Sequence, residues 1–118
     1  MPSEKEKPHV WITQIPHRHV GNDWIPAFDM APAHKWGIVK VIAPHSPTFL
    51  DTVELVKKLR TAMEDYNYER GDYLIMTGDP AVISIASAIL GDFTSRYRIL
   101  KWHMSSNNYI PVEVNLEP

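Results

Sequence analysis

The turn Thr77-Gly78-Asp79-Pro80 has the residue types best suited to binding a ligand. It follows an apolar run at 72–76 and precedes an apolar helical pattern at 81–90. If the run is a strand of a parallel sheet, the turn lies at the carboxyl edge, where open α/β sheets bind ligands. The first N–H groups of the following helix favour an anion there. A candidate phosphate or nucleotide site follows, made of His45, Ser46, Thr77, Gly78 and Asp79.

The same turn also has a purely structural interpretation. Asp79 is a good N-cap, and Pro80 suits the first position of a helix. Neither the dinucleotide-binding nor the P-loop motif is present. Asp79 would repel a phosphate unless a metal or an arginine intervened, although a carboxylate at a strand end can hold magnesium. The sequence leaves both interpretations open.

A second constellation is His17-Arg18-His19. In an extended segment the two histidines face the same side, and such a pair can begin a metal site. The third ligand would be His34, His45 or Asp23. The alternative is a solvated polar segment beside Pro16. We predict no metal and no other cofactor, and if a metal does bind, His17 and His19 are its candidate ligands.

The helical pattern at 81–90 is apolar on nearly every side, which is typical of a helix buried on more than one side. Its small residues Ser84, Ser87, Ala88 and Gly91 form a narrow stripe. The covering element is either a second subunit or the aromatic-rich segment of the same chain. We therefore predict a homodimer or another protein complex. The candidate interface residues are Trp24, Phe28, Ser84, Ser87 and Ala88.

Basic residues near the end of the chain offer a third possibility. Arg96, Arg98 and Lys101 alternate with Tyr97 and Trp102, and basic residues beside aromatic ones can bind single-stranded nucleic acid. The alternative is an ordinary solvated strand face. The formal net charge of the chain is −2, so no general positive field attracts nucleic acid. We predict that nucleic acid is not a partner.

Composition bounds the class of protein. The 118 residues suit one domain, with 44% hydrophobic and 22% charged residues as in a globular protein. We predict a flexible tail at 1–8 and a single domain at 9–118. The chain has no cysteine, which excludes disulfides and thiolate metal sites and fits a reducing cytoplasm. No apolar run approaches the roughly 18 residues that a membrane span needs.

The elements that position these residues follow from periodicity and from turn residues. Strands are predicted at 9–15, 37–43 and 72–76, and a hairpin at 97–104 and 109–116. A helix is predicted at 51–66, capped by Asp51 and Glu54, and another at 81–90, ended by Gly91. The segment 17–36 is predicted to be a long loop. The order β-loop-β-α-β-α-β-β indicates an α/β domain whose mixed, mostly parallel sheet ends in an antiparallel hairpin.

Six short segments of the chain form a recognisable pattern: Val10 to Arg18 (VWITQIPHR), Ile25 to Phe28 (IPAF), Ala31 to Ala33 (APA), Tyr66 to Asp72 (YNYERGD), Gly78 to Ala81 (GDPA) and Leu100 to Trp102 (LKW). In this order they resemble a family of small bacteriophage proteins of no assigned activity, and the likeness covers most of the chain beyond the tail. His103 is one departure, since an aspartate is expected after the tryptophan.

This resemblance implies a phage product that acts in the cytoplasm of the infected bacterium, and it implies no particular activity. We expect a non-catalytic protein that binds a host or phage protein during host takeover. Two alternatives remain. One is a small-ligand or nucleotide-binding domain, or an enzyme, that uses the crevice after the second and third predicted strands. The other is a nucleic-acid binder.

Overall fold

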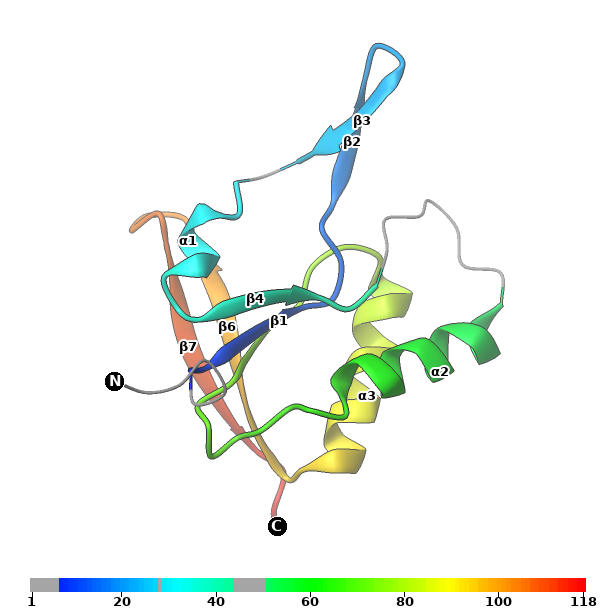
Figure 1. Ribbon diagram of the computed structural model, residues 1–118. Helices are drawn as coiled ribbons and strands as arrows, with labels where there is room; N and C mark the ends of the chain where they lie inside the picture. Colours follow the sequence, from blue (N-terminus) through cyan, green and yellow to red (C-terminus); the bar gives the residue numbers. More distant parts are fainter. Residues whose placement is uncertain (1–6, 28, 44–50) are drawn as a thin grey trace.

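The computed structural model describes residues 7–27, 29–43 and 51–118 (Figure 1). They form seven strands and three helices. The strands are β1 His9–Ile12, β2 His17–Val20, β3 Asp23–Pro26, β4 Ile38–Val41, β5 Tyr73–Ile75, β6 Arg96–His103 and β7 Asn108–Asn115. The helices are α1 Ala31–His34, α2 Thr52–Met63 and α3 Pro80–Phe93.

Five strands make the main sheet, in the order β4-β1-β5-β6-β7. The neighbours from β4 to β6 are parallel, and β7 is antiparallel to β6. The mixed, mostly parallel α/β sheet with its C-terminal hairpin is therefore confirmed. This spatial order is the one found in flavodoxin-like doubly wound sheets, although here the last strand is antiparallel.

The helices cover the two faces of the sheet unequally. Buried residues of α2 and α3, such as Leu59 and Leu90, pack with Trp11, Leu74 and Tyr97 on one face. On the other face Ala33 of the short α1 packs over a smaller cluster that includes Ile12. None of the helices in the described ranges is long and apolar enough to cross a membrane.

Local signals explain both long helices. Asp51 accepts the N–H of Glu54 at 3.1 Å before α2, and Asp79 accepts the N–H of Ala81 at 2.8 Å before α3. The predicted end of α3 at Gly91 is wrong, because the helix continues to Phe93. Gly91 is not left-handed here; a Cβ on it would lie 3.4 Å from Leu116. The glycine therefore allows close packing on the end of the chain.

The segment 17–36 is not a loop, so that prediction is wrong. β2 and β3 form a separate two-stranded sheet around Gly21, whose φ is +62°. Figure 1 shows this hairpin extending away from the main sheet before the chain returns through α1. A Gly-Asn pair is a known hairpin-turn signal, and glycine adopts the positive φ without strain.

A buried carboxylate joins β1 to β5 at the amino ends of these two strands. Asp72 is fully buried and accepts the N–H of His9 at 2.8 Å and the indole N–H of Trp11 at 3.1 Å. Arg70 donates to it at 2.6 and 2.8 Å. Burial alone would raise the pKa of Asp72, but these hydrogen bonds, chiefly from Arg70, hold the pKa below its ordinary value.

Edge strand β7 contains Pro111, a residue that sheets tolerate mainly at their edges. The N–H of Leu116 donates to the carbonyl of Ser95, so these two residues form a hydrogen-bonded pair. Such pairs occur at every second residue of an antiparallel ladder, and they therefore recur at Val114, Val112 and Ile110. Pro111 lies between them, and its nitrogen faces the open edge. It therefore removes a donor from the free edge without weakening the pairing with β6.

Candidate functional site

The turn before α3 is fastened to the end of β1 by two side chains. The hydroxyl of Thr13 accepts the N–H of Thr77 at 2.7 Å and donates to the carbonyl of the same residue at 2.6 Å. The side-chain oxygen of Gln14 accepts the N–H of Asp79 at 2.8 Å. Gly78 has a φ of +99° and lies directly against the Gln14 side chain.

These bonds occupy three of the backbone donors at this turn. The N–H groups of Thr77, Asp79 and Ala81 each donate to an acceptor in the chain. His45 and Ser46 lie outside the described residues, so the predicted ligand set stays a prediction. Of its members, Thr77 borders a cavity, but a different one from the crevice expected after the second and third predicted strands.

That cavity opens where β5 and β6 separate. The two strands are in register at Leu74 and Ile99. Beyond this pair β5 turns toward α3, whereas β6 continues to His103. The resulting crevice has a volume of about 760 Å³. Its lining residues come from four stretches of the chain, 29–32, 75–77, 99–102 and 107–112: Asp29, Pro32, Ile75, Met76, Thr77, Ile99, Leu100, Lys101, Trp102, Asn107, Tyr109 and Val112.

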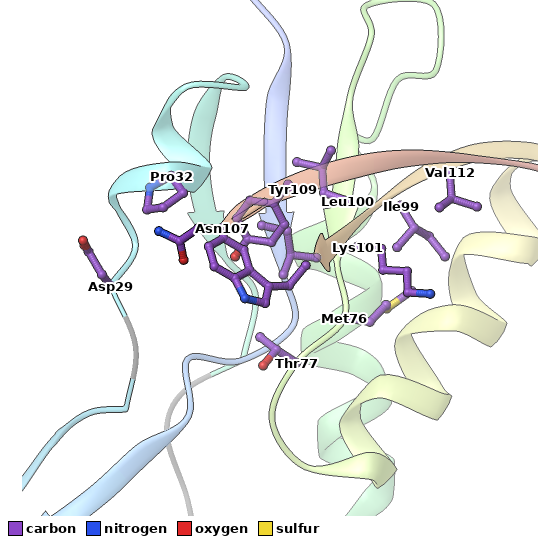
Figure 2. A pocket seen from close by; sticks show the side chains of 12 residues that line it. Asp29, Pro32, Met76, Thr77, Ile99, Leu100, Lys101, Asn107, Tyr109 and Val112 are labelled. Carbon is purple, nitrogen blue, oxygen red and sulfur yellow. The ribbon is translucent and has the colours of Figure 1, made fainter. Parts of the chain in front are cut away.

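The crevice is mostly apolar and has a few polar groups, which is typical of small-molecule sites of 300–1,000 Å³. Trp102 and Tyr109 meet edge to face, with ring centroids 5.0 Å apart. Burial raises the pKa of Tyr109, so its phenol is neutral at pH 7. Figure 2 shows Asp29 and Pro32 at one end of the crevice, and Met76 and Lys101 toward the other.

The two charged groups of the crevice differ in their surroundings. The carboxylate of Asp29 accepts the N–H of Ala31 at 2.9 Å, at the start of α1. Lys101 forms no ion pair with a carboxylate of the described residues. The crevice thus has one anion, Asp29, that accepts a backbone hydrogen bond. It also has one cation, Lys101, that no carboxylate of the described residues neutralises.

The histidine pair lies on the projecting hairpin. His17 and His19 are on one face of it, where Nδ1 of His17 lies 2.8 Å from the carbonyl of Ile15 and His19 stacks on Trp24. Asp23 pairs with Val20, so its side chain is on the opposite face. Across the described ranges, no three His, Cys, Asp or Glu side chains are placed to hold a metal ion.

The predicted interface residues fall on two separate surfaces. Trp24, 51% exposed, is on the projecting hairpin. Ser84 and Ala88 are exposed on α3, whereas the half-buried Ser87 donates to the carbonyl of Ile83. Phe28 lies outside the described residues. The aromatic-rich segment does not cover α3, because α1 packs on the opposite face of the sheet.

The small residues of α3 border an uncovered part of the sheet. Gly91, on the same side of the helix as Ser84 and Ala88, lies next to Leu116. Strand β7 places Ile110, Val112 and Val114 on this face, and Leu116 continues the alternation beyond the strand. The exposed fractions are 42% for Ile110, 39% for Val112 and 53% for Leu116. We call Ser84, Ala88, Ile110, Val112 and Leu116 the α3–β7 surface.

The basic residues of β6 are largely neutralised. Arg98 pairs with Glu113 at 2.9 Å and covers the ring of Tyr68, and Arg96 lies 3.6 Å from Glu117. Tyr97 is buried, so its ring is not available to stack on a base. Only Lys101 of the three predicted cations lacks a carboxylate partner within the described chain.

The fold and site define a small open-sheet α/β domain with a crevice at the carboxyl edge of its sheet. Comparison with protein families identifies the group. Residues 8–116 match the profile of the Phage Pam3 gp32-like protein family, and the chain belongs to that family. The expected bacteriophage family is thereby confirmed. No curated protein and no solved structure matches the chain.

The crevice contains residues that the sequence did not identify as a site. The sequence pattern links Lys101 and Trp102 only to nucleic acid, and it singles out none of Asp29, Asn107 and Tyr109. An aromatic residue on each strand of the terminal hairpin was the available signal, since Trp102 and Tyr109 are direct partners in it. Their meeting with Met76 and Thr77 depends on where β5 and β6 part, which no local pattern predicts.

Proposed function

We propose that this phage protein is a non-catalytic binding protein that associates with other proteins, including a second copy of itself, in the cytoplasm of the infected host. The observation that carries the proposal is the α3–β7 surface. It places exposed Ile110, Val112 and Leu116 beside the small side chains of Ser84 and Ala88. Contiguous exposed apolar side chains are typical of protein interaction sites.

The topology explains why this surface lacks a covering element. In an open α/β sheet a helix normally follows each parallel strand and covers one face. Here β6 is joined to β7 by a tight turn, so no crossover helix packs over the hairpin. A helix from a partner fits this place, because small residues on α3 allow close approach. In a homodimer the partner helix is the α3 of the second copy.

Pairing of a partner strand with the open edge of β7 is a less favourable route to association. Pro111 removes a hydrogen-bond donor from the outer edge of β7. It does not obstruct contacts made through the face of the sheet. The proposed partner therefore packs on the α3–β7 surface and does not extend the sheet.

Sedimentation velocity at micromolar concentration tests the homodimer. We expect a dimer for the unaltered protein and a monomer for the double variant Ile110→Glu, Leu116→Glu. Val20→Glu is the matched control, because Val20 is 49% exposed on the projecting hairpin. A monomeric unaltered protein, or a double variant that still dimerises, would refute the homodimer.

Other partners are tested with the same variants. Affinity capture from infected-host lysate should recover a protein with the unaltered chain and with Val20→Glu, and lose it with the double variant. Recovery that is equal for all three would place the contact elsewhere. Recovery of no stable partner, together with a monomer in solution, would contradict the proposed function.

A further inference from the structure

We propose that the crevice between β5 and β6 binds an aromatic anion, meaning a flat apolar molecule that carries a carboxylate, sulfonate or phosphate group. The crevice has room for such a molecule, about 760 Å³. This inference does not depend on the protein–protein function proposed above. It concerns a different site, which shares only Val112 with the α3–β7 surface, and the variants that test it leave the residues of that surface unchanged apart from one control.

The side chains that line the crevice favour a ligand with an apolar body. Leu100 and Tyr109 are buried, and Trp102, 39% exposed, stands beside Tyr109 at the opening. Ile75 and Met76 line the crevice at the end of β5. Aromatic faces beside aliphatic side chains favour a flat ring system over a flexible or strongly hydrated molecule.

The charged side chains of the crevice favour a ligand with an anionic group. Lys101 lines the crevice without a carboxylate partner among the described residues, while Asp29 at the far end is engaged with the N–H of Ala31. A cationic ligand that fills the crevice would be repelled by Lys101, and Asp29, the carboxylate that could pair with it, lies at the opposite end. An anion instead pairs with the ammonium group. The amide of Asn107 and the hydroxyl of Thr77 are further polar groups of the crevice.

A pair of fluorescent dyes provides the test. Anilinonaphthalene sulfonate has a flat apolar body with one negative charge, and phenylnaphthylamine has nearly the same body without the charge. We expect one saturable site for the sulfonate. Lys101→Gln should weaken it about fivefold, the upper range for an exposed ion pair, and leave the affinity for the neutral dye unchanged. Added salt should weaken only the charged dye.

Matched variants locate the site. Lys58→Gln removes an exposed cation of α2 that has no ion pair in the described chain, and should not affect either dye. Leu116→Ser alters the α3–β7 surface and should also preserve binding. Energy transfer from tryptophan to the bound dye should fall more with Trp102→Phe than with Trp24→Phe, because Trp24 is on the projecting hairpin. Circular dichroism confirms that each variant is folded.

Several results would overturn the inference. They are the absence of saturable binding, equal loss with Lys101→Gln and Lys58→Gln, and loss of the dye with Leu116→Ser. Equal affinity of the unaltered protein for both dyes would refute the anionic group. None of these results bears on dimerisation, which the sedimentation experiment measures separately.

Discussion

The side-chain oxygen of Gln14 accepts the backbone N–H of Asp79 at 2.8 Å, so a residue just beyond β1 closes the turn that starts α3. Gln14 is buried, and Gly78 lies against it. The contact joins two neighbouring parallel strands at the point where a doubly wound sheet usually binds its ligand. In this protein a side chain of the chain itself occupies that position.

This contact predicts that Gly78→Ala lowers the free energy of unfolding by about 2–4 kcal/mol, from a disfavoured φ and from overpacking. A Cβ at Gly78 would lie 2.7 Å from Cβ of Gln14. Gly21→Ala is the control, because Gly21 also has positive φ but no atom within 4 Å of the added Cβ. It should lose only about 1–2 kcal/mol in urea unfolding. Equal losses would show that Gln14 does not restrict position 78.

The cap of α3 gives a second prediction. Asp79→Ala should lower stability by about 1 kcal/mol, because the N–H of Ala81 loses its acceptor. Asp79→Asn should retain most of the stability, since asparagine is an equally good cap. Millimolar inorganic phosphate should not raise the melting temperature of the unaltered protein. A clear rise that Asp79→Asn increases would support an anion site at this turn instead.

Asp72 is predicted to be the most sensitive polar position. Asp72→Asn should cost about 3–5 kcal/mol, because it leaves the largely buried Arg70 guanidinium, 11% exposed, without its closest carboxylate. Asp65→Asn removes the other carboxylate near Arg70, but Asp65 is 61% exposed. Its loss should cost less than about 1 kcal/mol. Chemical unfolding of both variants gives the comparison, and similar losses would contradict the assigned role of Asp72.

Acid sensitivity should begin with His9. Burial, and then the charges of Arg70 and Lys40, lower the pKa of His9 below 6.5, so folding favours the neutral ring. The unfolded chain takes up this proton first, and stability should fall as the pH drops from about 6.5 through the lower folded pKa. Asp72, whose pKa is also lowered, adds its loss below about pH 4.

Urea midpoints measured between neutral pH and pH 4 test this order. His9→Gln should reduce the slope of stability with pH in the upper part of the range. The lowered pKa favours the neutral ring of His9, so its 3.7 Å contact with Asp65 has little ion-pair character near neutral pH. A slope that His9→Gln leaves unchanged would contradict the assignment.

The open edge of β7 yields the last prediction. Pro111→Val supplies a backbone donor that faces solvent and a residue that favours strands, so it should increase self-association in light scattering without reducing stability. Adding Asn115→Pro, which blocks another N–H facing the free edge, should reverse the increase. No change in scattering would mean that Pro111 does not protect this edge.

Local signals in the sequence predicted most of the main sheet and both long helices. Alternating or continuous apolar runs marked the strands, and Asp51, Asp79 and Pro80 marked the helix starts. The projecting hairpin was missed, although Gly21-Asn22 is a two-residue turn signal. Its strands contain His17, Arg18 and Asp23, and they lack the apolar alternation that identifies a strand packed on a core.

The candidate site was less predictable, for a physical reason. The partners of the turn at 77–80 are Thr13 and Gln14, more than sixty residues away, and only the strand order makes them neighbours. The crevice depends on the divergence of β5 and β6 after Leu74 and Ile99. Such long-range geometry leaves no periodic trace in the sequence, whereas capping and turn chemistry are local.

The short pairing between β5 and β6, at Leu74 and Ile99, has a consequence for folding. The β6–β7 hairpin closes a turn of four residues and pairs along its whole length, so it can form early and by itself. The other half of the sheet needs long crossovers before β4, β1 and β5 meet. We expect the hairpin to be a separate cooperative unit, whose amides exchange with solvent in a step of their own. An aromatic anion held between β5 and β6 would bridge the two units and slow that exchange.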